Sequence, residues 1–338
     1  IKNKIKMNNL INFDDFIEIT RDKAEKLKLV EFLQQLGLVS RNFNCPKCRK
    51  EMKLSFRNDT ADGCYWLCTE KTSVAKKKPQ KCRSSVSIRN RTIFAQSKLK
   101  IGQILRLIFF VVDQIPVQKI ERYVGVSKPT ICRWAEFLRH IIFDSMMTNS
   151  EKLGGPGKIV EIDESKFGRQ KYHRGHHVEG QWIFGGYEVG SGKIFLIPVP
   201  NRTESTLVPL IKEWILPGTT IRSDCWAAYR CLENEGYIHE TVNHSLHFKD
   251  PNTGCHTNHI ESTWRHAKQT LPCCNCRREF YAGYLAFYMF NKKVKSLRQD
   301  PFFYFCNIIK EYYARMNEEN IEINTIIEEE EIASDDNE

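Results

Sequence analysis

Three carboxylates stand beside predicted secondary-structure elements, although they are far apart in the sequence. Asp163 follows the apolar stretch "KIVEI", Asp224 follows "TTIRS", and Glu261 lies near the start of the helical segment "TNHIESTWRHAK". Oxygen ligands of this kind suit Mg2+ or Mn2+, and two such ions about 3.5 to 4 Å apart can activate an attacking oxygen and stabilise a leaving one. The residue types therefore predict a metal-dependent phosphodiester site that is formed by Asp163, Asp224 and Glu261.

Local structural roles for the same residues compete with this prediction. Asn258 can act as an N-cap with Glu261 three residues later, which approximates a capping box. Glu261 can also pair with Arg265 one helical turn away, a contact that stabilises an exposed helix by about 0.2 to 0.5 kcal/mol. An aspartate after a strand often caps a turn. The three positions alone leave both interpretations open.

The segment from 158 to 292 has the elements of an α/β domain that could bring the carboxylates together. Its hydrophobic patterns predict the order βββαβαβα, with a helix over 227–235 and a strand near "HETVNH". This is the order of an RNase H-like domain. Because functional side chains of α/β sheets gather where strands end, we expect Asp163 and Asp224 to lie at one edge of the sheet.

A cysteine-bearing segment over 41–92 precedes this domain. "CPKC" has the spacing of a zinc-binding arm, and two later cysteines supply a second arm. The predicted structural Zn2+ site of this zinc ribbon consists of Cys45, Cys48, Cys68 and Cys82. Cys64 competes as the fourth ligand, and buried free thiols are the alternative to a metal site. The lack of a secretory h-region favours a reducing compartment, where clustered cysteines bind metals more often than they form disulfides.

Residues 98–146 follow a helix-turn-helix pattern. A first helix ends near Gly125, and a second begins after Ser127, which can serve as its N-cap. The second helix leaves three polar side chains available to phosphates or base edges, namely Lys128, Thr130 and Arg133. An ordinary helical hairpin has the same pattern. A further helical segment over 1–40 precedes the cysteines.

The charge distribution favours a polyanionic partner. The net charge is +10, but residues 1–315 carry 51 basic and only 31 acidic side chains, because the segment 316–338 is wholly acidic in its charged residues. That tail has the composition of a disordered segment. The longest apolar run, "ILRLIFFVV", is too short to span a bilayer, so we expect no membrane association.

Several motifs resemble one family. "EIDESKF", "SDCWAAY" and "VNHSLHFKDPNTGCHTNHIESTWRHAK", together with the upstream zinc-ribbon and helix-turn-helix segments, are similar to transposases of the Merlin superfamily and their bacterial insertion-sequence relatives. The resemblance covers roughly residues 40–292. It implies an RNase H-like fold and an Asp-Asp-Glu catalytic triad, which falls on Asp163, Asp224 and Glu261.

The leading hypothesis is a cut-and-paste DNA transposase that binds double-stranded terminal inverted repeats and target DNA and acts as a homo-oligomer. The alternatives are a domesticated, catalytically idle DNA-binding regulator and a nuclease without strand transfer. We expect nuclear localisation in a eukaryotic host and cytoplasmic localisation otherwise. The histidines of "HRGHH" at 173–177 favour contacts to DNA over a catalytic zinc site, and we expect His256 and His259 to contact phosphate or cap the helix.

Overall fold

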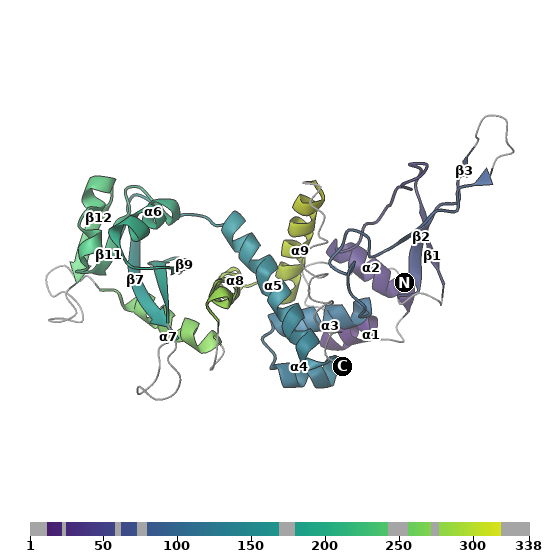
Figure 1. Cartoon of the computed structure of the whole chain (residues 1–338), viewed down its shortest axis with the longest axis horizontal. Helices are drawn as coiled ribbons and strands as arrows, with labels where there is room; N and C mark the ends of the chain where they lie inside the picture. The colour runs from purple at the N-terminus through teal and green to yellow at the C-terminus, as the bar shows by residue number, and fades with distance from the viewer. Residues whose placement is uncertain are drawn as a thin grey trace, which may run out of the picture. The chain divides into compact units, whose positions relative to one another are not determined.

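The computed structural model describes residues 12–21, 25–57, 62–72, 80–168, 180–242, 256–271 and 277–318 (Figure 1). The chain divides into two units, of which one comprises Ile1–Leu138 with Asp300–Glu338 and the other comprises Arg139–Gln299. The division falls within a single long helix, α5 (Lys128–Thr148). Within the described ranges, every helix is too short or too polar to cross a membrane.

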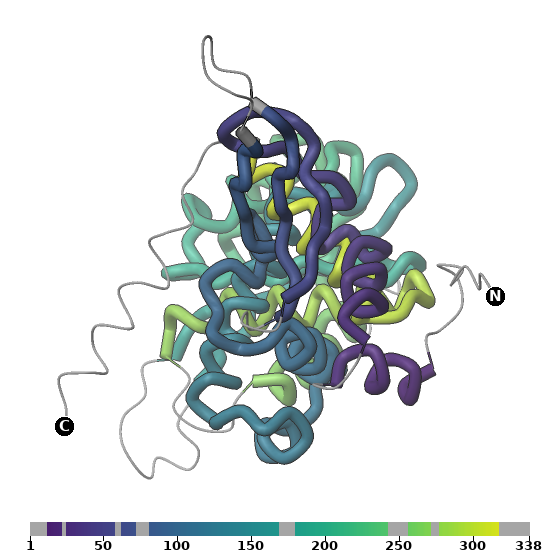
Figure 2. Tube along the Cα trace, turned by 90° about the vertical axis from the view of Figure 1, so that its right-hand side faces the viewer, coloured from purple at the N-terminus to yellow at the C-terminus, as the bar shows by residue number. Residues whose placement is uncertain are grey.

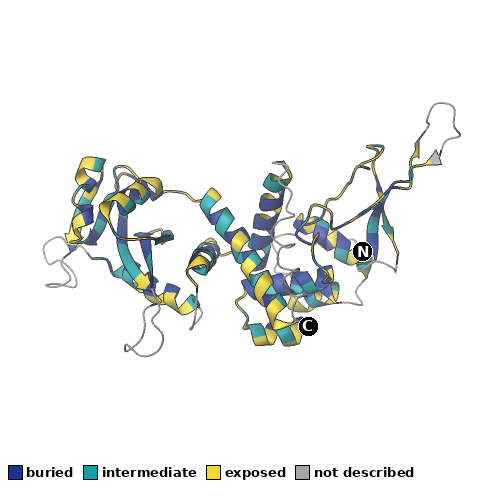
Figure 3. Cartoon of the chain, viewed as in Figure 1, coloured by how far each residue is buried: buried dark blue, intermediate teal, exposed yellow. Residues whose placement is uncertain are grey.

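The first unit has a helical core to which both ends of the chain contribute. Phe16, Phe109 and Phe302 pack together, with ring centroids 4.8 Å apart for Phe16 and Phe109 and 5.3 Å apart for Phe16 and Phe302. The helices that supply this core are α1 (Phe13–Thr20), α2 (Lys26–Leu36), α3 (Ile101–Val112) and α9 (Pro301–Glu318). Figure 3 colours buried residues dark blue, and such residues occur along both α3 and α9.

The C-terminal helix α9 was not anticipated as part of this unit. It packs against α2 and α3, which lie more than 180 residues earlier in the chain. It also includes residues 316–318, the beginning of the predicted acidic tail, whose remaining residues lie outside the described ranges. An apolar helix face finds its partner through tertiary packing, which local sequence patterns do not reveal.

The cysteine-bearing segment forms a small antiparallel sheet in the order β1-β2-β5. Its strands run side by side in Figure 2. Trp66 on β2 is buried and stacks near Phe43, with ring centroids 6.1 Å apart. A separate short hairpin pairs β3 with β4. The strands are β1 (Lys53–Phe56), β2 (Cys64–Leu67), β3 (Lys71–Thr72), β4 (Gln80–Lys81) and β5 (Ser85–Ser87).

The two helices of the predicted helix-turn-helix segment are present as α4 (Val117–Val124) and α5. Gly125 ends α4 with φ +70°, a left-handed conformation in which glycine has no steric cost. Ile120 and Val124 on α4 and Ile131 on α5 are buried, so the apolar face of each helix contributes to the core. The predicted order of a helix, a turn at Gly125 and a second helix is therefore present in the structure.

The second unit is built on a mixed five-stranded sheet in the order β12-β11-β7-β8-β9. Strands β7, β8 and β9 are antiparallel neighbours, whereas β11 pairs in parallel with both β7 and β12. Two short strands, β6 and β10, pair separately. The strands are β6 (Leu153–Gly154), β7 (Ile159–Phe167), β8 (Gln181–Glu188), β9 (Ile194–Val199), β10 (Ile215–Leu216), β11 (Thr220–Asp224) and β12 (Ile238–Val242).

Helices cover both faces of this sheet. Trp214 of α6 (Glu204–Trp214) contacts Phe195 on one face, with ring centroids 5.4 Å apart. On the other face lie α7 (Asn258–Thr270) and α8 (Tyr281–Leu297), and Leu196 N donates to Met289 Sδ of α8. The side chains of neighbouring strand residues alternate between the two faces, so Phe195 contacts α6 while Leu196 lies with Trp264 of α7 against Gly185.

Two parts of the predicted element order need correction. Strand β7 does not end at Asp163 but continues to Phe167, because it pairs along its length with β8. The segment 227–235 is not one α-helix but two 3-10 helices, η1 (Ala227–Tyr229) and η2 (Leu232–Glu235). Its buried side chains Tyr229 and Leu232 are three residues apart, which suits the three-residue turn of a 3-10 helix.

Candidate active site

Asp163 and Asp224 lie on neighbouring parallel strands at matching heights. The register between β7 and β11 pairs Glu161 with Arg222, and each aspartate lies two residues further along its own strand. Neighbouring strands are about 4.8 Å apart, and residues two apart on a strand share a face. The sheet therefore presents the two carboxylates from adjacent strands on the face that α7 covers; Asp224 ends its strand as expected, whereas β7 continues past Asp163.

Trp264 of α7 fixes Asp163 in this position. The indole Nε1 donates to Asp163 Oδ2 at 2.9 Å, and Trp264 is buried. Gly185 is the residue of β8 directly opposite Asp163, and a Cβ at Gly185 would lie only 2.5 Å from the Trp264 ring. The glycine thus leaves room for the indole to lie against the sheet and to reach the aspartate.

Glu261 is positioned by the first turn of α7. The N-cap of this helix is Thr257, so the prediction of Asn258 as the N-cap is wrong; Asn258 is the first helical residue. Thr257 Oγ1 donates to Glu261 Oε1 at 3.1 Å, and Glu261 N donates to Thr257 O at 3.1 Å. The threonine hydroxyl therefore orients the Glu261 side chain and makes no capping bond to the helix backbone.

The cap of α7 comes instead from a strand residue, Glu161. This fully buried carboxylate accepts hydrogen bonds from His259 N at 2.9 Å, Ile260 N at 3.1 Å and His259 Nδ1 at 2.7 Å. It satisfies two of the unpaired N–H groups at the helix start, and the positive end of the helix dipole stabilises its charge. His259 also stacks on Tyr187, the residue opposite Glu161 on β8, with ring centroids 5.0 Å apart.

Glu161 and Trp264 were missed by the sequence analysis. They hold α7 on the sheet at two positions on the same face of β7. Glu161 contacts His259 of α7, and Asp163 accepts from Trp264 of α7. The signal available in the sequence was the acidic residue of "VEID", since a charged side chain two residues before Asp163 in an otherwise apolar strand shares its face. His259 does not cap the helix, which was one of its two expected roles; it lies within α7, and both its main-chain N–H and its ring contact Glu161, which provides the cap.

The charges of Asp224 and Glu261 both act on Asp163. Burial raises the pKa of Asp163 to about 6, and the negative charges of Asp224 and Glu261 add to this increase, while the hydrogen bond from Trp264 opposes it. A bound cation would relieve this repulsion at Asp163. Asp224 Oδ1 accepts from Trp226 N at 3.1 Å, which ties this carboxylate to the turn that follows β11.

A fourth acid, Glu164, borders the same site. Burial raises its pKa to about 8, with further contributions from the charges of Asp163 and Asp224. Its Oε1 atom is buried and has no hydrogen-bond partner among the described residues, while Oε2 lies 3.9 Å from the Arg202 guanidinium. Glu164 therefore holds its proton more tightly than an ordinary glutamate, and it adds a second buried carboxyl group beside Asp163.

Two groups of described side chains bring three or more potential ligand atoms within 4.8 Å of one another. The first is the cysteine cluster described below, and the second combines Glu161 with His256 and His259. The triad itself is not such a group in this structure. The histidines of 173–177 lie outside the described residues.

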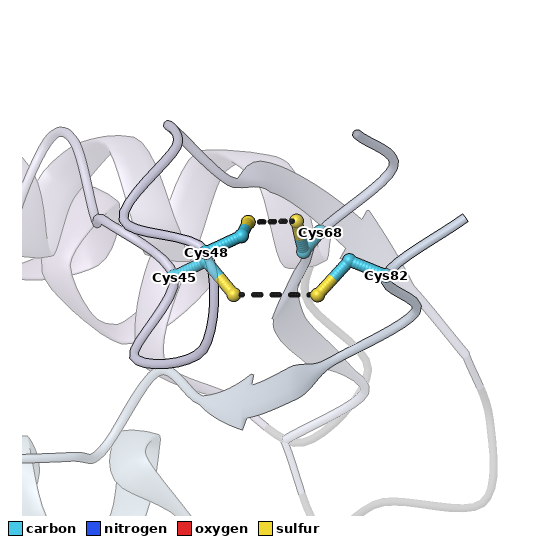
Figure 4. Close-up of side chains that lie close together, drawn as sticks. All are labelled: Cys45, Cys48, Cys68 and Cys82. Atoms are coloured by element: carbon cyan, nitrogen blue, oxygen red, sulfur yellow. Dashed lines mark hydrogen bonds between the residues drawn. The ribbon is translucent and has the colours of Figure 1, made fainter. Parts of the chain in front are cut away.

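The four predicted zinc ligands converge from two segments of the chain (Figure 4). The Sγ atoms of Cys48 and Cys68 are 3.4 Å apart, and those of Cys45 and Cys82 are 3.7 Å apart. A tetrahedral site with Zn–S bonds of about 2.3 Å places its sulfurs roughly 3.8 Å from one another. The donor set and its spacing therefore fit Zn2+.

Backbone donors prepare Cys45 for metal binding, whereas Cys64 lies apart. The N–H groups of Cys48 and Lys47 lower the pKa of Cys45 to about 6 against the opposing effect of burial. Cys64 Sγ instead contacts the carbonyl oxygen of Asp62 at 3.5 Å, and burial raises the pKa of its thiol to about 12. Cys64 is not a member of the cluster, which resolves the choice of fourth cysteine in favour of Cys82.

The predicted DNA-contacting residues lie in the first turns of α5. Lys128 and Arg133 are exposed, and Thr130 is half-buried. Lys128 Nζ lies 3.7 Å from Glu121 of α4, and Thr130 Oγ1 is 3.0 Å from Ser127 Oγ. All three side chains therefore lie near the start of one helix.

The second unit of the chain contains a region that is similar to a known protein domain. Residues 152–291 match an ISXO2-like transposase domain. This range contains Asp163, Asp224 and Glu261. A curated relative described as an uncharacterized transposase-like protein, from Haemophilus influenzae, is 33% identical over 83 residues. The match covers 25% of this chain and 66% of that protein. These similarities support a transposase or recombinase role.

Two solved integrase domains are also similar in structure. The catalytic core domain of BIV integrase has a TM-score of 0.30 and 16% identity, over 48% of this chain and 98% of that one. The HTLV-2 integrase catalytic core domain in complex with magnesium, in a dimeric form, has a TM-score of 0.26 and 16% identity, over 40% and 87% of the two chains. Because both TM-scores are low, the assignment of the fold rests on the strand order and pairing given above.

Proposed function

We propose that this chain is a DNA transposase of the Asp-Asp-Glu class, with Asp163, Asp224 and Glu261 as its catalytic carboxylates. The single observation that carries the proposal is their convergence. Two neighbouring parallel strands and one helix supply the three side chains, and the charges of Asp224 and Glu261 both raise the pKa of Asp163. The strand order of the sheet matches the RNase H-like plan, and the transposase-domain match covers residues 152–291 of the 139–299 unit, which include all three carboxylates. The Merlin superfamily is the specific group that we infer.

The donor chemistry of the site suits Mg2+ or Mn2+. When bound, such ions polarise the attacking oxygen and stabilise the leaving oxygen at a phosphodiester. The chain contributes the orientation of their ligands, because Trp264 holds Asp163, Thr257 holds Glu261 and the backbone of Trp226 holds Asp224. These positions rest on regular elements, which keeps the ligand geometry constant.

The remaining parts of the chain serve to hold DNA in this proposal. A Zn2+ ion bound by Cys45, Cys48, Cys68 and Cys82 would stabilise the small sheet β1-β2-β5, which has few buried apolar residues of its own. Helices α4 and α5 would bind terminal inverted repeats through Lys128, Thr130 and Arg133. A cut-and-paste reaction joins two ends of an element to target DNA, and since each chain has one triad, we infer a homo-oligomeric complex.

A catalytically idle DNA-binding regulator is the rival function. The burial of Asp163 and Glu164 beside Asp224 argues against it, because carboxyl groups with raised pKa values that lie next to further acids are typical of functional sites.

Strand cleavage and joining test the proposal directly. The full chain is incubated with a labelled duplex that carries the inverted repeats flanking the gene, with Mg2+ or Mn2+ and a supercoiled target. Cleaved ends followed by joined products are the expected result. Cleavage without joining would identify a nuclease, and repeat binding without cleavage would identify the regulator.

A further inference from the structure

Trp226 presents an exposed indole ring next to the proposed active site. It lies two residues after Asp224, and its main-chain N–H donates to Asp224 Oδ1 at 3.1 Å. Trp226 is 39% exposed, although tryptophan is among the largest apolar side chains. Buried neighbours such as Tyr229 show that the same turn can bury an aromatic ring, so the exposure of Trp226 calls for a separate explanation.

Arg202 locks this ring in place. The Trp226 Nε1–H donates to the Arg202 carbonyl oxygen at 3.1 Å, and the Arg202 guanidinium carbon lies 4.6 Å from the Trp226 ring centroid. The guanidinium is also 4.0 Å from the ring centroid of Trp182 and 3.9 Å from Glu164. Arg202 therefore contacts both indole rings, and it adds positive charge where a DNA strand would approach the acidic site.

This combination has the chemistry of a base-stacking platform. Aromatic side chains beside an arginine bind single-stranded nucleic acid by stacking on its bases, and they tolerate different sequences because every base has a flat face. A base within a duplex has both faces covered by its neighbours, so only a base that has left the stack can use such a ring. Because the ring lies next to Asp224, the stacked base would belong to a nucleotide beside the phosphate that is bound at this carboxylate.

We propose that Trp226, held by Arg202, stacks on an unpaired DNA base adjacent to the phosphate that is bound at Asp224. This proposal rests on the proposed function, since it assigns the strand to the same site. It goes beyond that function in naming a binding site for an unstacked nucleobase and the residue that forms it.

Binding measurements without divalent metal test the stacking site separately from catalysis. The full chain is titrated into a labelled blunt duplex and into the same duplex with unpaired thymidines at one 3′ end. The wild-type chain binds the overhang duplex more tightly. Trp226→Ala weakens binding to the overhang duplex by about 5- to 150-fold, as expected for the loss of one stacking contact, and leaves binding to the blunt duplex unchanged.

Two further variants control for other effects. Trp226→Phe keeps a ring and retains most of the preference for the overhang, which separates stacking from a folding defect. Leu216→Ala removes another apolar side chain of the same unit that is also 39% exposed, and it leaves both affinities unchanged.

The proposal is overturned if the wild-type chain shows no preference for the overhang. It is equally overturned if Trp226→Ala keeps that preference or loses affinity for both duplexes alike. Because no metal is present, a chain that prefers the overhang but fails to cut DNA when Mg2+ is added contradicts the proposed function and not the stacking site.

Discussion

Neutralising Glu164 should stabilise the protein at alkaline pH. The pKa of Glu164 is raised from 4.5 to about 8, mainly by burial and secondarily by the charges of Asp163 and Asp224. The folded state therefore holds this proton more tightly than the unfolded state does. The free energy of unfolding is therefore unaffected by Glu164 below pH 4.5 and decreases as the pH rises from 4.5 to 8. The full loss of unfolding free energy is on the order of 5 kcal/mol, since each pKa unit corresponds to about 1.4 kcal/mol.

Glu164→Gln removes that charge with little change of shape. We expect the variant to exceed the wild type in unfolding free energy by several kcal/mol at pH 9 and by less than about 1 kcal/mol at pH 5. Urea unfolding without divalent metal, followed by tryptophan fluorescence, measures the difference; four of the six tryptophans belong to this unit. Glu240→Gln is the matched control, because Glu240 pairs with Arg222 at 2.8 Å and should show no such gain. The reasoning is refuted if Glu164→Gln is less stable than the wild type at pH 9, or if its advantage is the same at both pH values.

Three further predictions concern the supporting parts of the chain. Cys82→Ser should abolish zinc binding in the full chain while Cys64→Ser preserves it, as measured by metal analysis after dialysis; the opposite result would show that the ligand set is wrong. Glu161→Gln should lower the unfolding free energy by about 1 to 3 kcal/mol, because it removes the negative charge at the start of α7 and replaces the oxygen that faces His259 Nδ1 with an NH2 group. It should also reduce DNA cleavage more than repeat binding; full cleavage by this variant would contradict its positioning role. Arg133→Ala should weaken binding to the inverted repeat more than binding to random duplex across a salt series, whereas equal losses would reduce Arg133 to a phosphate contact.

Local patterns in the sequence were sufficient to predict most elements of the sheet and the position of Asp224. Asp224 was expected at the end of a strand and lies there, because an apolar alternating segment bounded by turn residues has few other structures available. The clustering of the four cysteines was predictable because the spacing of "CPKC" is typical of one arm of a zinc site. The sequence could not decide between Cys64 and Cys82 as the fourth cysteine of the cluster. Either residue is near enough along the chain to meet the other three, and only the tertiary fold brings Cys82 to them.

Interactions between distant segments could not be predicted. The capping box proposed for Asn258 and Glu261 is locally reasonable, yet Glu161, about 98 residues earlier in the chain, provides the cap. The charge of Glu161 is unusual in an apolar strand, but local spacing does not reveal which distant residues it contacts. The same holds for Gly185, whose missing side chain makes room for Trp264, and for helix α9, whose partners lie near the other end of the chain.

The most direct test of the catalytic assignment compares Glu261→Gln with the wild type in cleavage and joining of a repeat-end duplex with Mg2+ or Mn2+. Asp163→Asn and Asp224→Asn are measured beside it, and a melting curve and repeat binding are recorded for each variant. If these carboxylates hold the catalytic metal ions, all three variants remain folded, bind the repeat and neither cut nor join it, because each has lost a charged oxygen ligand. A folded Glu261→Gln protein that cuts and joins DNA at the wild-type rate would contradict the assignment and leave Glu261 with a structural role at the start of α7.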